Sequence, residues 1–521
     1  MTKKISNESP ASMQNLPIGI QDFREIREND YLYVDKTALV YQLSMGKYYF
    51  LSRPRRFGKS LLLSTLKELF SGSQELFKGL WIYDKWNWAT SHPVIYLKIS
   101  SINYQRLGLY EALSKEMGEI ASQLGIILEE SELKDRFKEL IIKAAKDKKV
   151  VILVDEYDKP IIDYLGDSLK VKENKTVLKE FYSIIKDADP HIRFLFIAGV
   201  SKFSKVSIFS DLNNIEDITL SSYMNDVVGI TQQEMQENFA PFLIDTAQFL
   251  GETQQELLNN IKHWYNGYNW LGKNTLYNPF SLLSFFKKKQ FQNFWFETGT
   301  PTFLIEEVMK RRQFNFSEVQ SGYSGLSDFN TENLNTTTLL FQTGYLTVKE
   351  YNPKFQLYTL AYPNEEVRSS LLQYLIGAYR LENASESTPL VVQMYNALHE
   401  KNIKELINII NTAFSTIPYD LWRGATELHY HALVHLTFSL LGTYMQSEVH
   451  SAKGRCDALV QTPQYIYAFE FKLDESAELA LQQIEEKGYL SPYLQHSQQK
   501  IAIGINFSSE KKCVDAYKVK E

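Results

Sequence analysis

The chain has 521 residues, too many for one hydrophobic core, and two to four domains are expected. Its composition, with 44% hydrophobic and 23% charged residues, is that of a folded soluble protein. The net charge of −6 excludes a globally basic nucleic-acid binder, so any polyanion site must be a local patch. Two cysteines cannot form a disulfide framework. The N-terminus has no signal-peptide pattern, and no apolar run is long enough to cross a membrane. A cytoplasmic protein without membrane contact is predicted.

The first part of the chain has the pattern of an α/β domain. Residues 1–15 are polar and are predicted to be a disordered tail. Within 16–225, segments of helical periodicity alternate with short apolar runs, which are 47–52, 94–100, 149–155 and 192–200. Strands that alternate with helices predict a parallel sheet covered on both faces.

The first apolar run ends in a turn that contains Gly58, Lys59 and Ser60, and a leucine-rich helical pattern follows. This order suits a phosphate-binding loop, written G-x-x-x-x-G-K-[ST], whose backbone N–H groups and helix N-terminus bind phosphates. Lys59 would contact the β- and γ-phosphates, the Ser60 hydroxyl would bind Mg²⁺, and Gly58 would let the backbone approach the phosphate. The first glycine of the pattern falls at position 53, where this chain has Arg53.

Arg53, Arg55 and Arg56 place three cations in this loop. They could bind the nucleotide, bind a nucleic-acid backbone, or be solvated. If position 53 needs a positive φ, a residue other than glycine costs about 1 kcal/mol, which a fold can tolerate. Arg53 therefore weakens the prediction of ATP hydrolysis more than the prediction of ATP binding.

Acidic residues at the end of a second apolar run support the nucleotide site. Asp155 is expected to hold the Mg²⁺ shell, and Glu156 to orient the attacking water. Ser201, with Lys202 beside it, follows the next run, at the position of a polar sensor of the γ-phosphate. A basic turn before a helix is common in proteins, and so is a pair of acids after a strand, so neither feature by itself indicates a nucleotide site. The combination of the two predicts binding of ATP and Mg²⁺.

Residues 226–400 are mostly helical in pattern. Two strand-like runs joined at Asn352 and Pro353 lie between helical segments, an order that suits a winged helix and equally a helix-hairpin-helix packing. The aromatic run 263–270 could stack on bases, although such runs are more often part of a core. We expect this region to act as a lid or a nucleic-acid contact.

Residues 401–521 contain a long helix followed by strands and a further helix. Asp457 lies on one predicted strand, and Glu470 and Lys472 share a face of the next. Two carboxylates can hold Mg²⁺, and a lysine can position a water for attack on a phosphodiester. This D…E-x-K order is that of PD-(D/E)XK nucleases, and a restriction-endonuclease-like α/β domain is predicted here.

Neighbouring residues extend this second constellation. Glu427, on the preceding helix, matches the additional acid that such domains often use as a metal ligand. Gln483 and Tyr489 match the helix that follows the core strands. The proline that usually precedes the aspartate is replaced by Cys456, which nothing in the sequence marks as a nucleophile.

Several segments together resemble a known family, and they are 16–26, 33–40, 49–72, 154–161, 199–219 and 277–283. They are similar to the bacterial AAA-ATPase-like family that carries a C-terminal PD-(D/E)XK nuclease-type domain, and the resemblance covers nearly the whole chain. It implies that Arg53 follows the family pattern. It also implies an AAA-type P-loop core in which Lys59, Ser60, Asp155 and Glu156 have the roles above, and a homo-oligomer, which is usual for AAA proteins.

The resulting expectation is an ATPase coupled to a Mg²⁺-dependent nuclease, with DNA as the nucleic-acid partner in preference to RNA. A role in defence against foreign DNA or in mobile-element biology would suit this architecture. The alternative is a nucleotide-dependent switch or scaffold whose nuclease-like domain binds without cutting, which the net negative charge and Arg53 favour. A third interpretation is a DNA-binding regulator that uses the hairpin.

Overall fold

The computed structural model describes the chain in segments, which are 13–202, 208–209, 212, 214–296, 302–311, 316, 318–327, 335–380, 387–415, 436–441, 446–447 and 456–521. The chain forms two compact units. The first comprises Met1–Gly299 and Glu318–Glu366, and the second comprises Thr300–Ser317 and Val367–Glu521. No helix in the described part of the chain is both long and apolar enough to cross a membrane.

A five-stranded parallel sheet forms the centre of the first unit, in the order β2-β3-β4-β1-β5. Every residue of β1 and β3 is buried, which explains why these strands read as continuous apolar runs. The parallel sheet predicted from the alternating pattern is confirmed. The strands are β1 (Tyr48–Ser52), β2 (Val94–Lys98), β3 (Val150–Asp155), β4 (Ile192–Gly199) and β5 (Glu216–Asp217).

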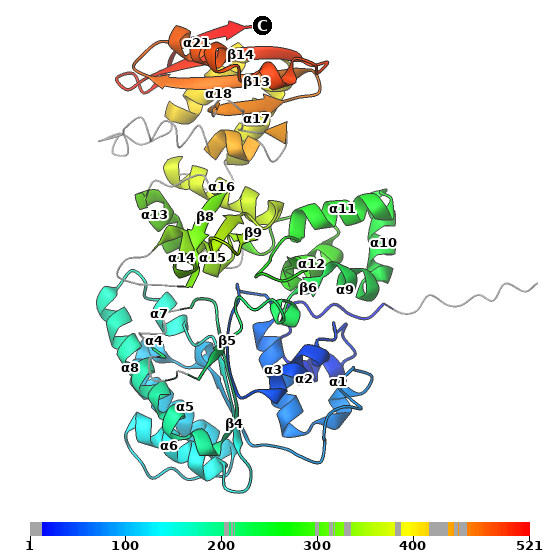
Figure 1. Ribbon diagram of the computed structural model, residues 1–521, viewed down its shortest axis with the longest axis vertical. Helices are drawn as coiled ribbons and strands as arrows, with labels where there is room; N and C mark the ends of the chain where they lie inside the picture. Colours follow the sequence, from blue (N-terminus) through cyan, green and yellow to red (C-terminus); the bar gives the residue numbers. More distant parts are fainter. Residues whose placement is uncertain are drawn as a thin grey trace, which may run out of the picture. The chain divides into compact units, whose positions relative to one another are not determined.

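Helices flank this sheet, with α3 on one side of β4 and α5, α6 and α8 on the other (Figure 1). Each connects strands that run in the same direction, so the chain must cross over the sheet between them. The helices are α1 (Phe23–Glu28), α2 (Thr37–Met45), α3 (Lys59–Ser71), α4 (Tyr104–Leu107), α5 (Leu109–Gln123), α6 (Leu133–Ala144), α7 (Lys159–Ile162) and α8 (Ser168–Asp187). Short 3₁₀ helices are Gln74–Phe77, Ile99–Ser101, Asp189–His191, Asn225–Val227 and, in the second unit, Ser491–Tyr493.

A helical subdomain follows the sheet and shares a core with the N-terminal segment. Leu32 packs in one cluster with Phe239, Ile261 and Phe285. This shared core explains why the helical region belongs to the first unit, although the sequence analysis separated it at residue 226. Its elements are β6 (Ile230–Thr231), α9 (Gln232–Asn238), α10 (Ala240–Leu250), α11 (Gln254–Tyr265), β7 (Leu276–Tyr277) and α12 (Pro279–Lys288).

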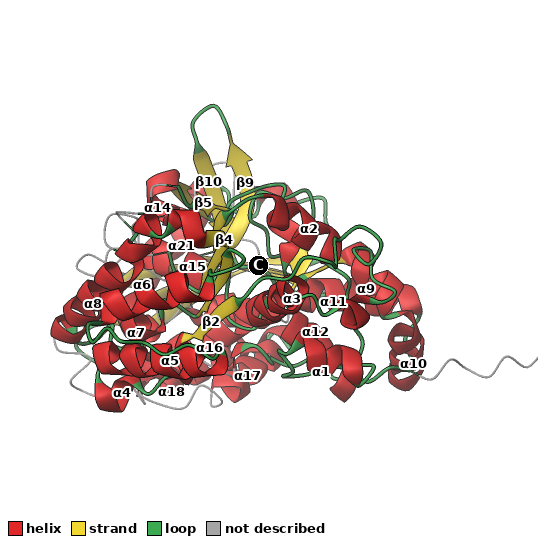
Figure 2. Ribbon diagram, turned by 90° about the horizontal axis from the view of Figure 1, so that it is seen from below, coloured by secondary structure: helices red, strands yellow, loops and turns green. Residues whose placement is uncertain are grey.

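A three-stranded antiparallel sheet, in the order β8-β10-β9, contains the hairpin whose turn stands out in Figure 2. The element order suits a winged helix, but α15 is buried from Thr336 to Gln342 and presents no free face for a DNA groove. The hairpin turn, where Phe355 is exposed, is open to a partner. The elements are β8 (Val319–Gly322), α14 (Tyr323–Ser327), α15 (Thr336–Thr343), β9 (Thr347–Asn352) and β10 (Leu357–Ala361).

The second unit is built on a mixed five-stranded sheet in the order β11-β12-β13-β14-β15. Strand β13 pairs antiparallel with β12 and parallel with β14. The Tyr467 hydroxyl on β13 donates to the Leu398 carbonyl at 2.7 Å, so the helix before residue 400 packs with this sheet and the predicted boundary at residues 400 and 401 falls inside the unit.

The strands of this sheet are β11 (Gln446–Ser447), β12 (Ala458–Gln461), β13 (Tyr465–Leu473), β14 (Gln499–Ser508) and β15 (Cys513–Lys520). The helices are α13 (Thr302–Arg311), α16 (Glu365–Arg380, which begins in the first unit), α17 (Ser387–His399), α18 (Ile403–Ser415) and α21 (Ala477–Lys487). Helix α21 lies against β14 at Gly504, where a Cβ would come within 2.3 Å of the Ala477 carbonyl oxygen. This close approach fixes α21 over the strands that carry the candidate site.

Candidate functional site

The candidate phosphate loop joins β1 to α3 through a sharply turned backbone. Arg56 and Gly58 have φ values of 62° and 94°, in the left-handed region. Gly58 is the N-cap of α3, a position where its left-handed conformation costs little. Arg53 is not among the described residues with a positive φ, so the strain considered for it in the sequence analysis does not arise.

Lys59 is enclosed by the loop that it follows. Its side chain is buried, and its Nζ donates to the carbonyl oxygens of Arg53 at 2.9 Å and Pro54 at 2.8 Å. Burial lowers the pKa of Lys59, and the carboxylates of Asp155 and Glu156 oppose this shift. The ammonium therefore lies inside the loop, next to acidic groups, with its hydrogen bonds made to the backbone.

Asp155, at the end of β3, is buried in the same place. Within the described part of the chain, neither carboxylate oxygen makes a hydrogen bond of good geometry. Burial raises the pKa of Asp155, and the Ser60 hydroxyl and the Lys59 ammonium oppose the rise, which shows that both lie close by. A buried carboxylate that makes no hydrogen bond of good geometry is costly, and a bound cation would remove that cost. Asp155 and Ser60 therefore fit a Mg²⁺ ion.

Glu156 follows directly, with a φ of 54°, and is half-buried. Ser201 is buried at the neighbouring strand end, but both its backbone N–H and its hydroxyl donate to Asp158 Oδ2, each at 2.6 Å. Lys202 forms an ion pair with Asp217. The structure thus brings Glu156 next to Asp155, whereas the donors of Ser201 are already engaged by an acid.

Asp158 is a residue that the sequence analysis missed. Its buried Oδ2 also accepts the Val200 N–H at 3.0 Å, so one carboxylate fixes the chain where it leaves β4. Its place three residues after Asp155, in the run DEYDKP, was the available signal.

The three loop arginines occupy different environments. The Arg53 side chain is fully buried, donates from Nη1 to the Thr219 carbonyl at 2.7 Å, and lies 4.2 Å from the centre of the Trp270 ring. Arg55 is half-buried. Arg56 is exposed, with its guanidinium 4.0 Å from the centre of the Phe280 ring.

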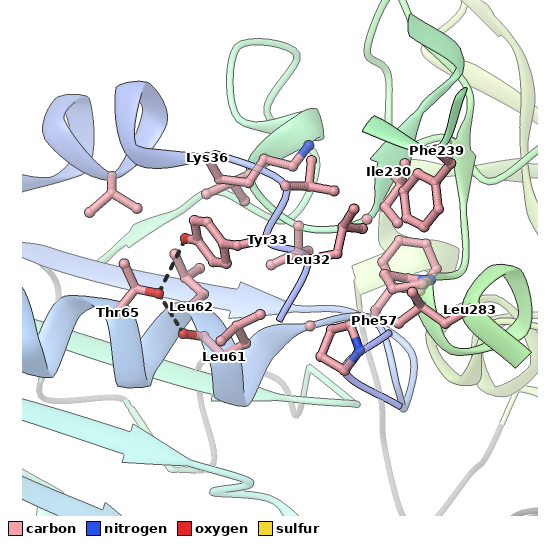
Figure 3. Close-up of a pocket in the computed structure, with 18 residues that line it drawn as sticks. Leu32, Tyr33, Lys36, Phe57, Leu61, Leu62, Thr65, Ile230, Phe239 and Leu283 are labelled. Atoms are coloured by element: carbon pink, nitrogen blue, oxygen red, sulfur yellow. Dashed lines mark hydrogen bonds between the residues drawn. The ribbon is translucent and has the colours of Figure 1, made fainter. Parts of the chain in front are cut away.

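An apolar cavity of about 100 Å³ adjoins Gly58 and the first turns of α3 (Figure 3). The N-terminal segment contributes Tyr33, whose hydroxyl pairs with that of Thr65 at 3.5 Å, and Lys36, whose Nζ bonds both carboxylate oxygens of Glu234 at 2.6 and 2.7 Å. An apolar cavity with few polar groups suits a flat aromatic base. Other lining residues are Leu32, Phe57, Leu62, Ile230, Phe239 and Leu283.

The second constellation lies where β12 and β13 pair. Their register pairs Ala458 with Phe469, which places Asp457 across from Glu470 one step further along. The Phe471 N–H donates to Asp457 Oδ2 at 2.8 Å. The hairpin expected from the sequence therefore brings the two carboxylates together.

Gln483 on α21 connects the other two members of this site. Its Nε2 donates to Glu470 Oε1, and its Oε1 accepts from Lys472 Nζ at 2.8 Å. Glu470 is buried, and its Oε2 has no hydrogen-bond partner among the residues that the structure describes. Burial, with a contribution from Asp457, raises the pKa of Glu470 to about 7, and Lys472 opposes the rise.

These carboxylates fit a divalent cation, because one oxygen of Glu470 is buried without a partner and Asp457 lies beside it. Glu427, the third predicted ligand, lies outside the described residues. In the described part of the chain, no group of three or more His, Cys, Asp or Glu side chains is placed to hold a metal. The described site is thus an acid pair with an adjacent lysine.

Cys456 and Tyr489 belong to the core beneath this site. The Cys456 Sγ donates to the carbonyls of Ala458 and Phe469, each at 3.1 Å, and burial raises the pKa of the thiol to about 12. A thiol with such a pKa is a weak nucleophile. Cys456 therefore has a structural role.

The loop and acid at the ends of parallel strands define the first region as a P-loop domain, and the Asp-Glu-Lys hairpin defines the second as PD-(D/E)XK-like. Residues 17–209 match the family model described as a predicted AAA-ATPase, and residues 425–517 match the PD-(D/E)XK nuclease superfamily. The chain is 40% identical over 526 residues to the "Uncharacterized protein in vnfD 5'region" of Azotobacter chroococcum mcd 1, covering 98% of this chain and 99% of that protein. The protein belongs to the AAA-ATPase-like family with a C-terminal PD-(D/E)XK nuclease domain, and the resemblance and fold class predicted from the sequence are confirmed.

Proposed function

We propose that the protein binds ATP with Mg²⁺ in its P-loop domain and that the nucleotide controls cleavage of a nucleic-acid backbone, DNA in preference to RNA, by its nuclease domain. The observation that carries this proposal is the meeting of Asp457, Glu470 and Lys472 at one strand end, with a buried Glu470 oxygen that lacks a partner within the described part of the chain. A domain that had become a mere scaffold has no need to bury such a group.

In the P-loop domain, Lys59 would exchange the carbonyls of Arg53 and Pro54 for phosphate oxygens. Asp155 and Ser60 would hold the Mg²⁺ ion, which neutralises charge on the phosphates when bound. Glu156, next to them, would orient the attacking water. The apolar cavity beside Gly58 would hold the base.

In the nuclease domain, Asp457 and Glu470 would hold a Mg²⁺ ion, with Glu427 as a further ligand. Such an ion, when bound, lowers the pKa of a water and stabilises charge on the scissile phosphate. Lys472 would leave the Gln483 carbonyl oxygen and donate to the water or the phosphate. Glu470 must lose its proton before it can bind a cation, because burial keeps its pKa at about 7.

A second candidate function is a nucleotide-dependent switch that hydrolyses ATP slowly. The observation that favours it concerns Ser201, the predicted γ-phosphate sensor. Its backbone N–H and its hydroxyl both donate to Asp158, so neither is free to contact a phosphate. A site without a free sensor would bind ATP and signal through its occupancy.

A cleavage assay with the full chain tests the proposal. Supercoiled plasmid, single-stranded DNA and RNA are incubated with Mg²⁺ or Mn²⁺, with and without ATP, and ATP binding is measured on the same samples. The variants are Glu470→Ala and Lys59→Ala, with exposed Glu475→Ala as the matched control on the adjoining segment.

We expect cleavage that is lost in Glu470→Ala, kept in Glu475→Ala, and changed in its response to ATP in Lys59→Ala. If the wild-type protein binds ATP but cuts no substrate under any condition, the nuclease proposal fails and the switch becomes the better account.

A further inference from the structure

Arg53 takes the place of the first loop glycine, and its side chain is directed into the protein rather than into solvent. It is fully buried, and Nη1 donates to the carbonyls of Thr219 at 2.7 Å and Ser52 at 3.0 Å. Its Nε and Nη2 find no hydrogen-bond partner among the described residues. Burial lowers the pKa of Arg53 to about 9, and Asp217 and Asp226 oppose the shift, so the side chain is charged at neutral pH. A buried charge with unused donors is costly, which calls for a functional explanation.

The aromatic partner of Arg53 belongs to the helical subdomain. The Trp270 ring lies 4.2 Å from the guanidinium carbon and is stacked on Tyr268, with ring centres 5.9 Å apart and planes 9° apart. The backbone N–H of Trp270 donates to Asn225 Oδ1 at 2.9 Å. These two rings lie on the connection between α11 and α12, so Arg53 ties the loop to the subdomain that lines the cavity.

The other end of the loop contacts the same two rings. Phe57 meets Tyr268 edge-on at 5.0 Å and Trp270 at 5.2 Å between ring centres. The Phe57 carbonyl accepts the Gly229 N–H at 3.2 Å, and a Cβ on Gly229 would come within 2.6 Å of the Phe57 ring. Residues 53 and 57 thus hold the loop between them against one aromatic pair.

Lys59 connects this arrangement to the phosphate position. Its Nζ bonds the carbonyls of Arg53 and Pro54, which are at the arginine end of the loop. If the Lys59 ammonium donates to a bound phosphate instead, the carbonyls of Arg53 and Pro54 lose their hydrogen-bond donor. The backbone at Arg53 would then have to adjust. The Arg53 side chain then carries that adjustment to Trp270.

We propose that Arg53 is a positioning residue that couples nucleotide occupancy of the phosphate loop to the α11–α12 connection through its stack on Trp270. The inference rests on the proposed ATP binding and adds a mode of regulation to that site. A planar guanidinium can stack on an indole while donating to carbonyls, whereas a lysine ammonium cannot do both in this geometry.

Fluorescence of Trp270 tests the coupling in the full chain. The protein has seven tryptophans, so the Trp270 signal of each protein is taken as the difference between its fluorescence and that of the same protein carrying Trp270→Phe. Mg-ATP is titrated while binding is measured separately by calorimetry. The test variant is Arg53→Lys. The control is Arg193→Lys, because Arg193 also donates to two carbonyls and lies 5.8 Å from a ring centre, that of Phe70.

In the wild-type protein and in Arg193→Lys, we expect the Trp270 signal to change with the midpoint of ATP binding. In Arg53→Lys, ATP should bind within about threefold of the wild-type affinity because Lys59 is intact, while the Trp270 response falls by at least about fivefold. A full Trp270 response in Arg53→Lys overturns the inference.

A second measurement needs no variant. Hydrogen exchange of residues 265–277 in the wild-type protein is compared with and without Mg-ATP, and a change in protection is expected. ATP binding that alters neither exchange nor fluorescence overturns the coupling and leaves the proposed function intact. Failure of the wild-type protein to bind ATP overturns both.

Discussion

The P-loop and nuclease sites each hold a lysine beside buried acids, but they hold it differently. Lys59 is bonded to backbone carbonyls of its own loop, whereas Lys472 is bonded to a neutral side chain, Gln483, that also holds Glu470. Lys59 can therefore leave its partners for a ligand only if the backbone of the loop adjusts. Lys472 can be released by rotation of the Gln483 amide alone. A backbone response can be passed on along the chain, while an amide rotation stays local.

The substitution Asp457→Ala should separate the activities of the two sites most clearly, because it should nearly abolish cleavage and leave ATP binding intact. Loss of this carboxylate should slow metal-dependent cleavage by about a thousandfold, or ~4 kcal/mol, because charge stabilisation at the phosphate is lost. ATP affinity should not change. Plasmid nicking rates and calorimetric ATP titrations check this, with exposed Glu475→Ala as the control. A parallel loss of ATP affinity would contradict the separation.

The pH dependence of stability should report on the nuclease site through Glu470. The folded-state pKa of Glu470 is about 7, above its ordinary value near 4.5, so the folded state favours the protonated acid. In the metal-free protein this costs nothing below pH 4.5, and the cost grows to on the order of 3 kcal/mol above pH 7. Glu470→Gln should therefore raise the melting temperature in EDTA at pH 8 and change it little at pH 5. Scanning calorimetry checks this, and an equal shift at both pH values would be evidence against it.

Lys59→Ala tests the loop. Removal of a charged donor should weaken ATP binding by tenfold to a hundredfold, or about 1.5–3 kcal/mol. Cleavage without ATP should remain. Binding is measured by calorimetry, with Lys67→Ala, a partly exposed lysine of the same helix, as the control. An unchanged ATP affinity in Lys59→Ala would show that Lys59 does not contact the phosphates.

The smallest effect is expected from Gln483→Ala, which removes the amide between Glu470 and Lys472. Loss of a residue that orients a metal ligand should weaken Mn²⁺ binding about tenfold. Calorimetric titration with Mn²⁺ measures it, and Gln482→Ala, exposed on the same helix, is the control. If Gln483→Ala binds Mn²⁺ as the wild-type protein does, the amide is not needed to orient Glu470.

Much of both sites follows from short sequence patterns. Lys59 and Asp155 meet because β1 and β3 both run parallel to β4 and end at one edge of the sheet, and Asp457 meets Glu470 because a hairpin has a fixed register. Local pattern and sheet geometry therefore suffice for these residues. For the same reason the parallel sheet was predicted from four of its five strands, whereas the two-residue β5 (Glu216–Asp217) was too short to be recognised.

The environment of Arg53 could not be read from the sequence, because it depends on Trp270, which is far along the chain. The loss of the free donors of Ser201 depends in the same way on Asp158, whose side chain turns towards the next strand. Periodicity reports which face a residue occupies, but not which distant side chain it meets there. Glu427 remains a prediction.

The two thiols of the chain differ in a way that is useful in solution. Cys513 is half-exposed, whereas Cys456 is buried under the nuclease sheet, with its Sγ donating to two carbonyls. An alkylating reagent will modify Cys513 directly but reach Cys456 only when the strands separate. The slow phase of labelling therefore reports how often this sheet opens, and it measures local unfolding of the PD-(D/E)XK domain without an added probe.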